Sequence, residues 1–245
     1  PEVMGETHAF LAVYQGRIVS ERYWRDYTAS DTYPSWSEAK SITHALVGIL
    51  TREGLIDVHA PADVPEWQGA DDPRRHITLD QLLRMSSGLK FAEDYVDAGV
   101  SDVIEMLFGG GKDDVAGFAA NFPLVHEPDS SWSYASGTTN IVARCATRAL
   151  GRSGDAFRSW MFRELFGPIG VQSAQPKFDA QGTFIGSSFC YATARDFARF
   201  GLLYMRDGVW DGQRILPEGW VDYARTPTNT PPTEPLGYGA HWWLG

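Results

Sequence analysis

The sequence has little cysteine, no excess of positive charge and no long apolar run. Its 245 residues include only Cys145 and Cys190, too few for a disulfide framework, so each is expected as a buried free thiol. The 21 Lys and Arg against 31 Asp and Glu give a formal net charge of -10, which disfavours nucleic acid as a partner. No apolar segment approaches the ~20 residues that span a bilayer, so no membrane span is expected.

The amino-terminal stretch PEVMGETHAF has neither the basic nor the hydrophobic region of a signal peptide. It does not start with Met and leads directly into sequence typical of a strand. We therefore expect a trimmed start, and no compartment can be assigned from the sequence.

Several common catalytic and ligand-binding motifs are also missing. The sequence contains no G-x-S-x-G, H-E-x-x-H or C-x-x-C. The three glycines at 109–111 lack the other positions of a Walker or dinucleotide motif. An α/β-hydrolase, a common metal site and a nucleotide site are thus unsupported, and no metal or organic cofactor is expected.

The pattern of apolar residues predicts strands near both ends of the chain and helices between them. Strands are expected over 8–14, 17–24, 182–191 and 238–244, the first two as a hairpin. Helices are expected over 37–54, 78–83, 101–108, 113–121, 138–150, 155–166 and 193–205, the last with Thr193 as its N-cap. This order indicates an α+β protein, with a discontinuous sheet part (1–59 plus 171–245) and a mainly helical subdomain (60–170).

The stretch SWSEAKS places Ser37 three residues before Lys40 at the start of an expected helix. Positions three apart share a helix face, so the lysine nitrogen can reach the serine hydroxyl. If burial desolvates Lys40, its pKa falls and its neutral amine can accept the hydroxyl proton. The pair therefore fits a nucleophile and its base.

A structural role is the competing interpretation, because serine is a common N-cap and a lysine three residues later is usually solvated. A second copy of the spacing, Ser87 to Lys90, contains a glycine and follows a short helix, so it offers no rigid face. His44 follows Ser37 by seven residues, ~10 Å along the axis, which is too far for direct proton transfer. We interpret His44 as a packing or supporting histidine.

A second polar group for this site is expected from the stretch SYASG, which contains Tyr134 and Ser136. A phenol facing Ser37 and Lys40 can pass a proton to a leaving group. Tyr33 has the same Tyr-x-Ser spelling but lies too close to Ser37 in sequence to form an opposite wall. For Tyr134, an ordinary buried tyrosine before a helix is the alternative.

Three longer stretches together carry a resemblance to a known family: YPSWSEAKSITHALVGIL, ITLDQLLRMSSGLKF and EPDSSWSYASGTTNIV. They resemble the serine β-lactamase-related hydrolases, which include class C β-lactamases, their esterase relatives and 6-aminohexanoate-dimer hydrolases. The later stretch VWDGQRILPEGWV is similar to the family as well. The resemblance implies a β-lactamase/transpeptidase-like fold, an antiparallel sheet flanked by helices.

The resemblance also implies roles for particular residues. Ser37 would be acylated, Lys40 would act in the proton transfers and Tyr134 would assist, while the Ser37 backbone N–H would form half of an oxyanion hole. Ser136 stands where β-lactamases usually have Asn, which suits an esterase or amidase better. Several tryptophans are expected to line an aromatic, substrate-binding cleft, with core packing as the alternative: Trp36, Trp132, Trp242 and Trp243.

Two features depart from the family pattern. Glu38 follows the nucleophile where the family usually has an uncharged residue, and we expect it to disfavour anionic substrates such as β-lactam carboxylates. The family's third motif, Lys-Thr-Gly or His-x-Gly on a strand, is absent: the last residues are GYGAHWWLG, and His241 does not fit it. We therefore expect a fragment, or a separate chain that carries the remaining C-terminal strands.

The predicted function is that of a serine hydrolase that forms an acyl-enzyme at Ser37 and cleaves a small neutral or cationic ester or amide. A β-lactamase or a D-amino-acid peptidase is the alternative within catalysis. A non-catalytic binding protein on the same fold is the alternative of another class.

Overall fold

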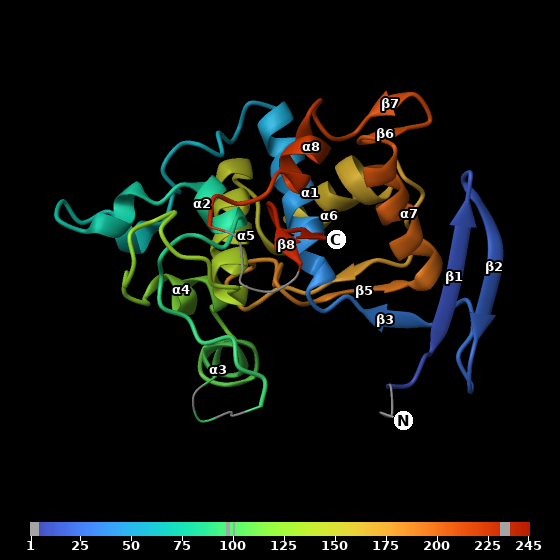
Figure 1. Ribbon diagram of the computed structural model, residues 1–245, viewed down its shortest axis with the longest axis horizontal. Coiled ribbons are helices and arrows are strands. Elements are labelled where there is room, and N and C mark those ends of the chain that lie inside the picture. Colours follow the sequence, from blue (N-terminus) through green and yellow to red (C-terminus); the bar gives the residue numbers. More distant parts are fainter. Residues whose placement is uncertain (1–4, 97–98, 100, 231–235) are drawn as a thin grey trace.

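The computed structural model describes residues 5–96, 99, 101–230 and 236–245 (Figure 1). Its α-helices are α1 (Glu38–Arg52), α2 (Leu79–Leu83), α3 (Asp102–Phe108), α4 (Val115–Ala120), α5 (Ser136–Leu150), α6 (Gly154–Met161), α7 (Ala194–Met205) and α8 (Trp220–Arg225). Single 3₁₀ turns at Pro65–Trp67 and Pro73–His76 and a π turn at Phe162–Phe166 complete the helical structure of the described residues. Each expected helix is present, with bounds that shift by a few residues.

The strands form four small antiparallel sheets. Their bounds are β1 (Ala9–Tyr14), β2 (Arg17–Tyr23), β3 (Thr32–Pro34), β4 (Gln175–Pro176), β5 (Cys190–Thr193), β6 (Val209–Trp210), β7 (Gln213–Arg214), β8 (Gly237–Tyr238) and β9 (Trp243–Leu244). The pairs β1–β2, β6–β7 and β8–β9 are hairpins, whereas β3–β5–β4 joins distant parts of the chain. The expected hairpin over 8–24 is thus confirmed.

The expected strand over 182–191 is mostly wrong. Only its last residues belong to β5, which runs on to Thr193. Upstream, tight turns replace the ladder: the Gly186 N–H donates to the Phe184 carbonyl, and the Ser188 N–H donates to the Ile185 carbonyl. These turns carry the chain along α1, where the carbonyl of Ser187 contacts the site described below.

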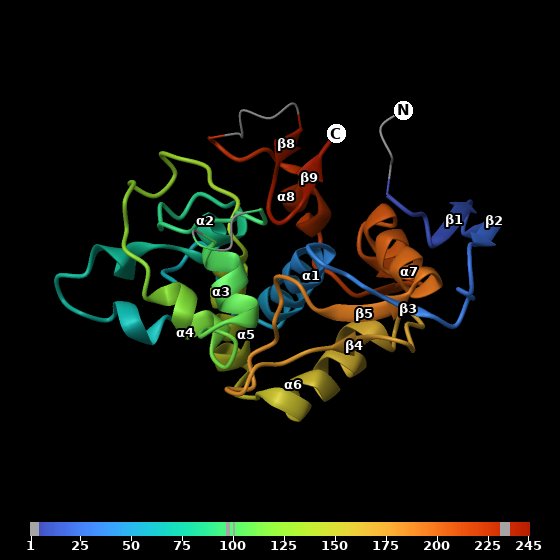
Figure 2. The same cartoon turned by 90° about the horizontal axis from the view of Figure 1, so that it is seen from below.

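Helix α1 lies in the middle of the molecule, between the helical region and the helices near the chain ends (Figure 2). Its residues 39–50 are all buried: the apolar side chains pack into the core, and the polar side chains of Lys40, Ser41, Thr43 and His44 have hydrogen-bond partners. Helix α5 packs against it. One cluster of buried side chains runs from the α1 region into the helical region. The division into a sheet part and a 60–170 subdomain therefore stays a prediction, although the elements described within 60–170 are helical.

The helix ends follow local sequence signals where these exist. Thr78 and Gln81 form a reciprocal capping box at α2, and the Thr193 side chain accepts from the Asp196 N–H at α7. Helix α5 has no capping side chain of its own at Ala135. Among the described residues, no helix combines the length and apolar character needed to cross a membrane.

Candidate active site

The strand before α1 places Ser37 at the helix start. The Ser35 N–H donates to the Cys190 carbonyl (3.1 Å), and the Cys190 N–H donates to the Ser35 hydroxyl (3.0 Å), so this segment is tied to β5. Trp36 then takes a left-handed backbone conformation (φ 42°), which is strained for a tryptophan, and Ser37 follows as the N-cap of α1. Strain of this kind is held by the surrounding structure and is common at functional sites.

Lys40 lies beneath Ser37 and is 1% exposed. Its Nζ donates to the Ser37 Oγ at 3.2 Å, to the Ser136 Oγ at 3.0 Å and to the Ser187 carbonyl at 3.0 Å. Burial lowers the pKa of Lys40 to about 8, although the nearby Glu93 carboxylate opposes this shift. A substantial share of the lysine is therefore neutral close to physiological pH, as a base for Ser37 requires.

Tyr134 forms the facing wall of the site, as the sequence predicts. The Lys40 Nζ lies 4.8 Å from the centre of the Tyr134 ring. Burial raises the pKa of Tyr134 to about 12, and the Ser37 hydroxyl nearby works against this rise. The phenol is thus protonated at neutral pH and contacts the nucleophile, a position from which it can donate a proton.

Ser136 lies behind the lysine and lines none of the pockets described around Ser37. It is 1% exposed, and its hydroxyl donates to the Glu93 carboxylate at 2.6 Å. The Ser136 N–H donates to the other Glu93 oxygen at 2.8 Å, so Glu93 caps α5 from a distant segment. Tyr95 also donates to Glu93. This placement favours positioning of Lys40, and the predicted contact of Ser136 with substrate stays a prediction.

Glu93 was not identified from the sequence. It lies in a loop without periodicity, and no motif connects it to Ser136, 43 residues later. The available signal was a pair of acidic residues, Glu93 and Asp94, shortly after the stretch TLDQLLRMSSGL, and this would not separate Glu93 from other surface acids.

The backbone N–H of Ser37 donates to no group in the described part of the chain, whereas the next three N–H groups of α1 each donate to a carbonyl. A free N–H at a helix start suits an anion, because the helix dipole adds partial positive charge there. Its role in an oxyanion hole stays a prediction, as does the position of a second donor.

Three pockets lie at or beside Ser37: Ser37 itself lines two of them, the third shares Tyr134 with both, and Trp243 lines all three. Trp36 is 55% exposed and borders an apolar pocket of about 580 Å³. Trp132 borders a neighbouring pocket of about 800 Å³, which Glu93 and Tyr95 also line. Trp243 stacks on Tyr134 with ring centres 5.5 Å apart. The structure thus brings the predicted aromatic residues around the nucleophile, and their contact with substrate stays a prediction.

The third pocket is small, about 220 Å³, and lies on the Glu38 side of Ser37. Desolvation raises the pKa of the Glu38 carboxyl to about 7. The side chain keeps an exposed surface, and contact with water limits this rise. His241 also lines this pocket. Its Nδ1 lies 3.1 Å from the Lys40 carbonyl, and burial lowers its pKa to about 3, so it is neutral.

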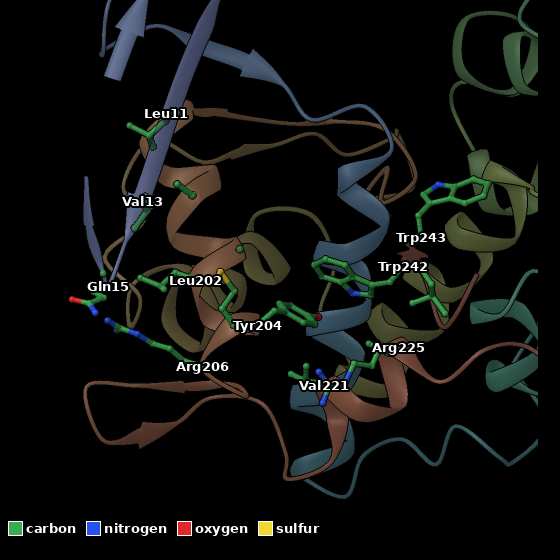
Figure 3. Close-up of a pocket in the computed structure, with 16 residues that line it drawn as sticks. Leu11, Val13, Gln15, Leu202, Tyr204, Arg206, Val221, Arg225, Trp242 and Trp243 are labelled. Carbon is green, nitrogen blue, oxygen red and sulfur yellow. The ribbon is translucent and has the colours of Figure 1, made fainter. Parts of the chain in front are cut away.

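A cavity with a larger volume than the pockets at and beside Ser37 lies elsewhere (Figure 3). It measures about 830 Å³ and opens between the β1–β2 hairpin, α7 and α8, with Trp242 and Trp243 on its far side. Leu11, Val13 and Leu202 make much of its wall apolar. It contains neither Ser37 nor Lys40, so we do not assign it to the chemistry.

The remaining candidates behave as the sequence indicates. Ser87 is buried but its hydroxyl accepts from the Leu89 N–H, and Lys90 is exposed. His44 is buried, with its Nδ1 2.8 Å from the Tyr204 hydroxyl. Cys145 and Cys190 are buried free thiols. The described residues include no cluster of His, Cys, Asp and Glu that could hold a metal ion.

The profile of the Beta-lactamase family matches residues 5–245. The chain belongs to this family. A relative, the 6-aminohexanoate-dimer hydrolase of Paenarthrobacter ureafaciens, is 28% identical over 227 residues, which cover 88% of this chain and 56% of its own length. The expected family and the β-lactamase/transpeptidase-like α+β fold are therefore confirmed.

Solved structures of the same fold agree. A Bacillus anthracis protein provisionally assigned as a 6-aminohexanoate-dimer hydrolase is 25% identical with a TM-score of 0.81, covering 96% of this chain and 64% of that one. A D-stereospecific amidohydrolase from Streptomyces sp. is 19% identical with a TM-score of 0.62, covering 91% of this chain and 73% of that one. The chain thus spans 56 to 64% of the first two relatives.

Proposed function

We propose that this Beta-lactamase family chain carries the nucleophile of a serine hydrolase that works through an acyl-enzyme. The observation that supports this most directly is the buried Lys40, whose Nζ lies 3.2 Å from the Ser37 Oγ and whose pKa is lowered to about 8. A lysine serves as a base only when desolvation favours its neutral form.

The proposed reaction has two halves. The Ser37 Oγ attacks a carbonyl carbon while its proton passes to the Lys40 Nζ, and the negative charge on the carbonyl oxygen faces the Ser37 N–H. The bond to the leaving group breaks as a proton reaches that group through Tyr134. Water then attacks the acyl carbon, one of its protons passes through Lys40 and Tyr134 to the Ser37 Oγ as the bond from that oxygen to the acyl carbon breaks, and the carboxylic acid leaves.

We propose a small neutral or cationic ester or amide as substrate. Glu38 beside Ser37 and the net charge of -10 both disfavour an anion. A β-lactam or a D-peptide is the second candidate, because the family and the Streptomyces neighbour carry such names and the acylation step would be the same.

We further propose that additional strands complete the site in the working protein. The β1–β2 and β8–β9 hairpins pair with no other described strand, and the apolar cavity of Figure 3 lies between them. Open strand edges are usually covered by further strands. A longer form of this chain or a separate chain would supply them, together with the second oxyanion donor.

The test is intact-mass spectrometry after exposure to a fluorophosphonate, on this chain and on a form that includes the additional strands. We expect one adduct that Ser37→Ala abolishes. Ser87→Ala is the matched control, since Ser87 has the same spacing to a lysine but no contact with it, and it should still be labelled. A form with the additional strands that takes no label would contradict the proposal and favour a non-catalytic binding protein.

A further inference from the structure

Helix α3 exposes apolar side chains on the face that its core contacts leave free. Val103 and Met106 are buried in the core, as expected for one side of an amphipathic helix. Ile104 and Leu107 are only half-buried, and Phe108 is 59% exposed. Exposed apolar side chains that lie together, as on this second face of α3, often mark a binding site.

This second face of α3 borders the pocket of about 580 Å³ beside Ser37, which we name the α3 pocket. Trp36, Tyr134 and Trp243 line the same pocket, together with Ser37 itself. Phe189 extends the aromatic surface, since its ring centre lies 5.8 Å from that of Trp36 and 6.0 Å from that of Phe108. None of the described residues that line the α3 pocket carries a charge.

The charged groups line the other two pockets. Glu93 lines the pocket of about 800 Å³, and the small pocket, about 220 Å³, contains Glu38 and Lys40. Because Ser37 lines both the α3 pocket and the small pocket, a substrate bound there meets one roomy pocket whose described lining residues are uncharged and one small polar space. Ligand sites of this type are mostly apolar, with a few polar groups that orient the reacting atoms.

We propose that the α3 pocket binds an extended apolar group of the substrate, an aliphatic chain of several carbons or an aromatic ring joined to the scissile ester or amide. This inference rests on the proposed function and deepens it, because it names the class of substrate. Burial of each methylene would raise kcat/KM about fourfold until the pocket is filled. Ile104 and Leu107 set the preference, and the small pocket takes the shorter group.

The experiment compares two series of esters: p-nitrophenyl esters from acetate to octanoate, and acetate esters of alcohols of the same lengths. We expect kcat/KM to rise with chain length in one series, which also tells whether the acyl or the leaving group occupies the α3 pocket. Leu107→Asn and Ile104→Trp should each lower, roughly tenfold, the ratio of kcat/KM for the six-carbon ester to kcat/KM for the two-carbon ester of that series. The ratio cancels any loss common to both esters.

Leu55→Asn is the matched control, because Leu55 is similarly apolar and 47% exposed but follows the opposite end of α1. It should leave the ratio unchanged. A labelled, active enzyme with flat profiles in both series would overturn this inference and leave the proposed function standing. An unlabelled protein would count against the proposed function instead.

Binding provides a second measurement that does not depend on turnover. Hexanamide should quench or shift the tryptophan fluorescence of Ser37→Ala at lower concentration than acetamide, since Trp36 and Trp243 border the pocket. Equal affinity for the two amides would overturn the inference even if the protein proves inactive.

Discussion

At the scale of single residues, the site depends on a lysine that is buried without a bonded carboxylate. Lys40 has three oxygen acceptors, and each is a hydroxyl or a carbonyl. Neutral acceptors stabilise an ammonium less than a carboxylate does, so desolvation prevails and the pKa falls to about 8. Glu93 is held one serine away, where it moderates this fall.

The pH dependence of labelling follows from this arrangement. The neutral amine is the active form, and a pKa of about 8 leaves about one-tenth of Lys40 neutral at pH 7. The rate of fluorophosphonate labelling should therefore rise roughly tenfold between pH 7 and pH 9. Stopped-time mass spectrometry across this range checks the prediction, and a flat profile would contradict it.

Replacement of Glu93 tests the electrostatic part of the same argument. Its negative charge favours the ammonium form of Lys40, so Glu93→Gln should move the midpoint of the labelling profile to lower pH. Glu218→Gln, at an exposed position, serves as the control. A midpoint that moves to higher pH in Glu93→Gln would show that the charge of Glu93 does not act on Lys40 in this way.

Glu38 gives a prediction on substrate charge. Desolvation raises the pKa of the Glu38 carboxyl towards about 7, so the share of the anion grows as the pH rises to neutrality and above. The rate for the anionic β-lactam nitrocefin relative to neutral p-nitrophenyl acetate should thus fall from pH 6 to pH 8. In Glu38→Gln the ratio should be higher at pH 8 and nearly constant. An unchanged ratio in this variant would remove Glu38 from specificity.

At the scale of elements, α1 is the helix on which the site is built. It is buried on all sides, and Gly48 is a point where a neighbouring helix comes close. A Cβ built there would lie 2.4 Å from the Trp220 Nε1, whose N–H donates to the His44 carbonyl. The glycine thus allows α8 to approach α1 closely, despite its weak helix propensity.

Gly48→Ala should therefore lower the free energy of unfolding by about 1–3 kcal/mol, because overpacking exceeds the gain in helix propensity. Gly201→Ala is the matched control: Gly201 lies in α7 with nothing within 4 Å of a built Cβ. That variant should gain up to about 1 kcal/mol. Urea unfolding of both checks the pair, and equal effects would contradict the role assigned to Trp220.

At the scale of the whole molecule, the apolar cavity of Figure 3 and the unpaired hairpin edges are the features that the described core leaves open. Val13 lines this cavity and is 39% exposed. Exposed apolar strands of this kind favour association with other chains. A net charge of -10 opposes association of the whole chain, but this repulsion is spread over the molecule and does not protect the open edge specifically.

We expect this chain to associate with itself at high concentration, and Val13→Lys to weaken the association by placing a charge at the open edge. Val125→Lys, at a residue 50% exposed away from the cavity, is the control. Sedimentation velocity over a range of concentrations measures the effect. Equal association in both variants would show that the β1 edge is not the contact surface.

The sequence by itself determined the elements with local signals: the first hairpin, the helices α1 to α7 with the Thr193 cap, and Ser37 with Lys40 on one helix face, whereas α8 was not anticipated. Helical spacing brings that contact within reach once α1 forms. Tyr134 was a candidate from its own stretch, and the resemblance to a known family strengthened it. The prediction of a strand over 182–191 was mostly wrong, because tight turns without a strong local signal form there.

Only the tertiary structure decided how charge and space are arranged around the nucleophile. The contacts of Glu93 with Ser136 and of Ser187 with Lys40 join segments 43 and 147 residues apart, and no local preference encodes them. The α3 pocket likewise exists because packing brings α3 beside Trp36. A pKa or a pocket depends on which atoms surround a group, and that is fixed by long-range packing and not by neighbours along the chain.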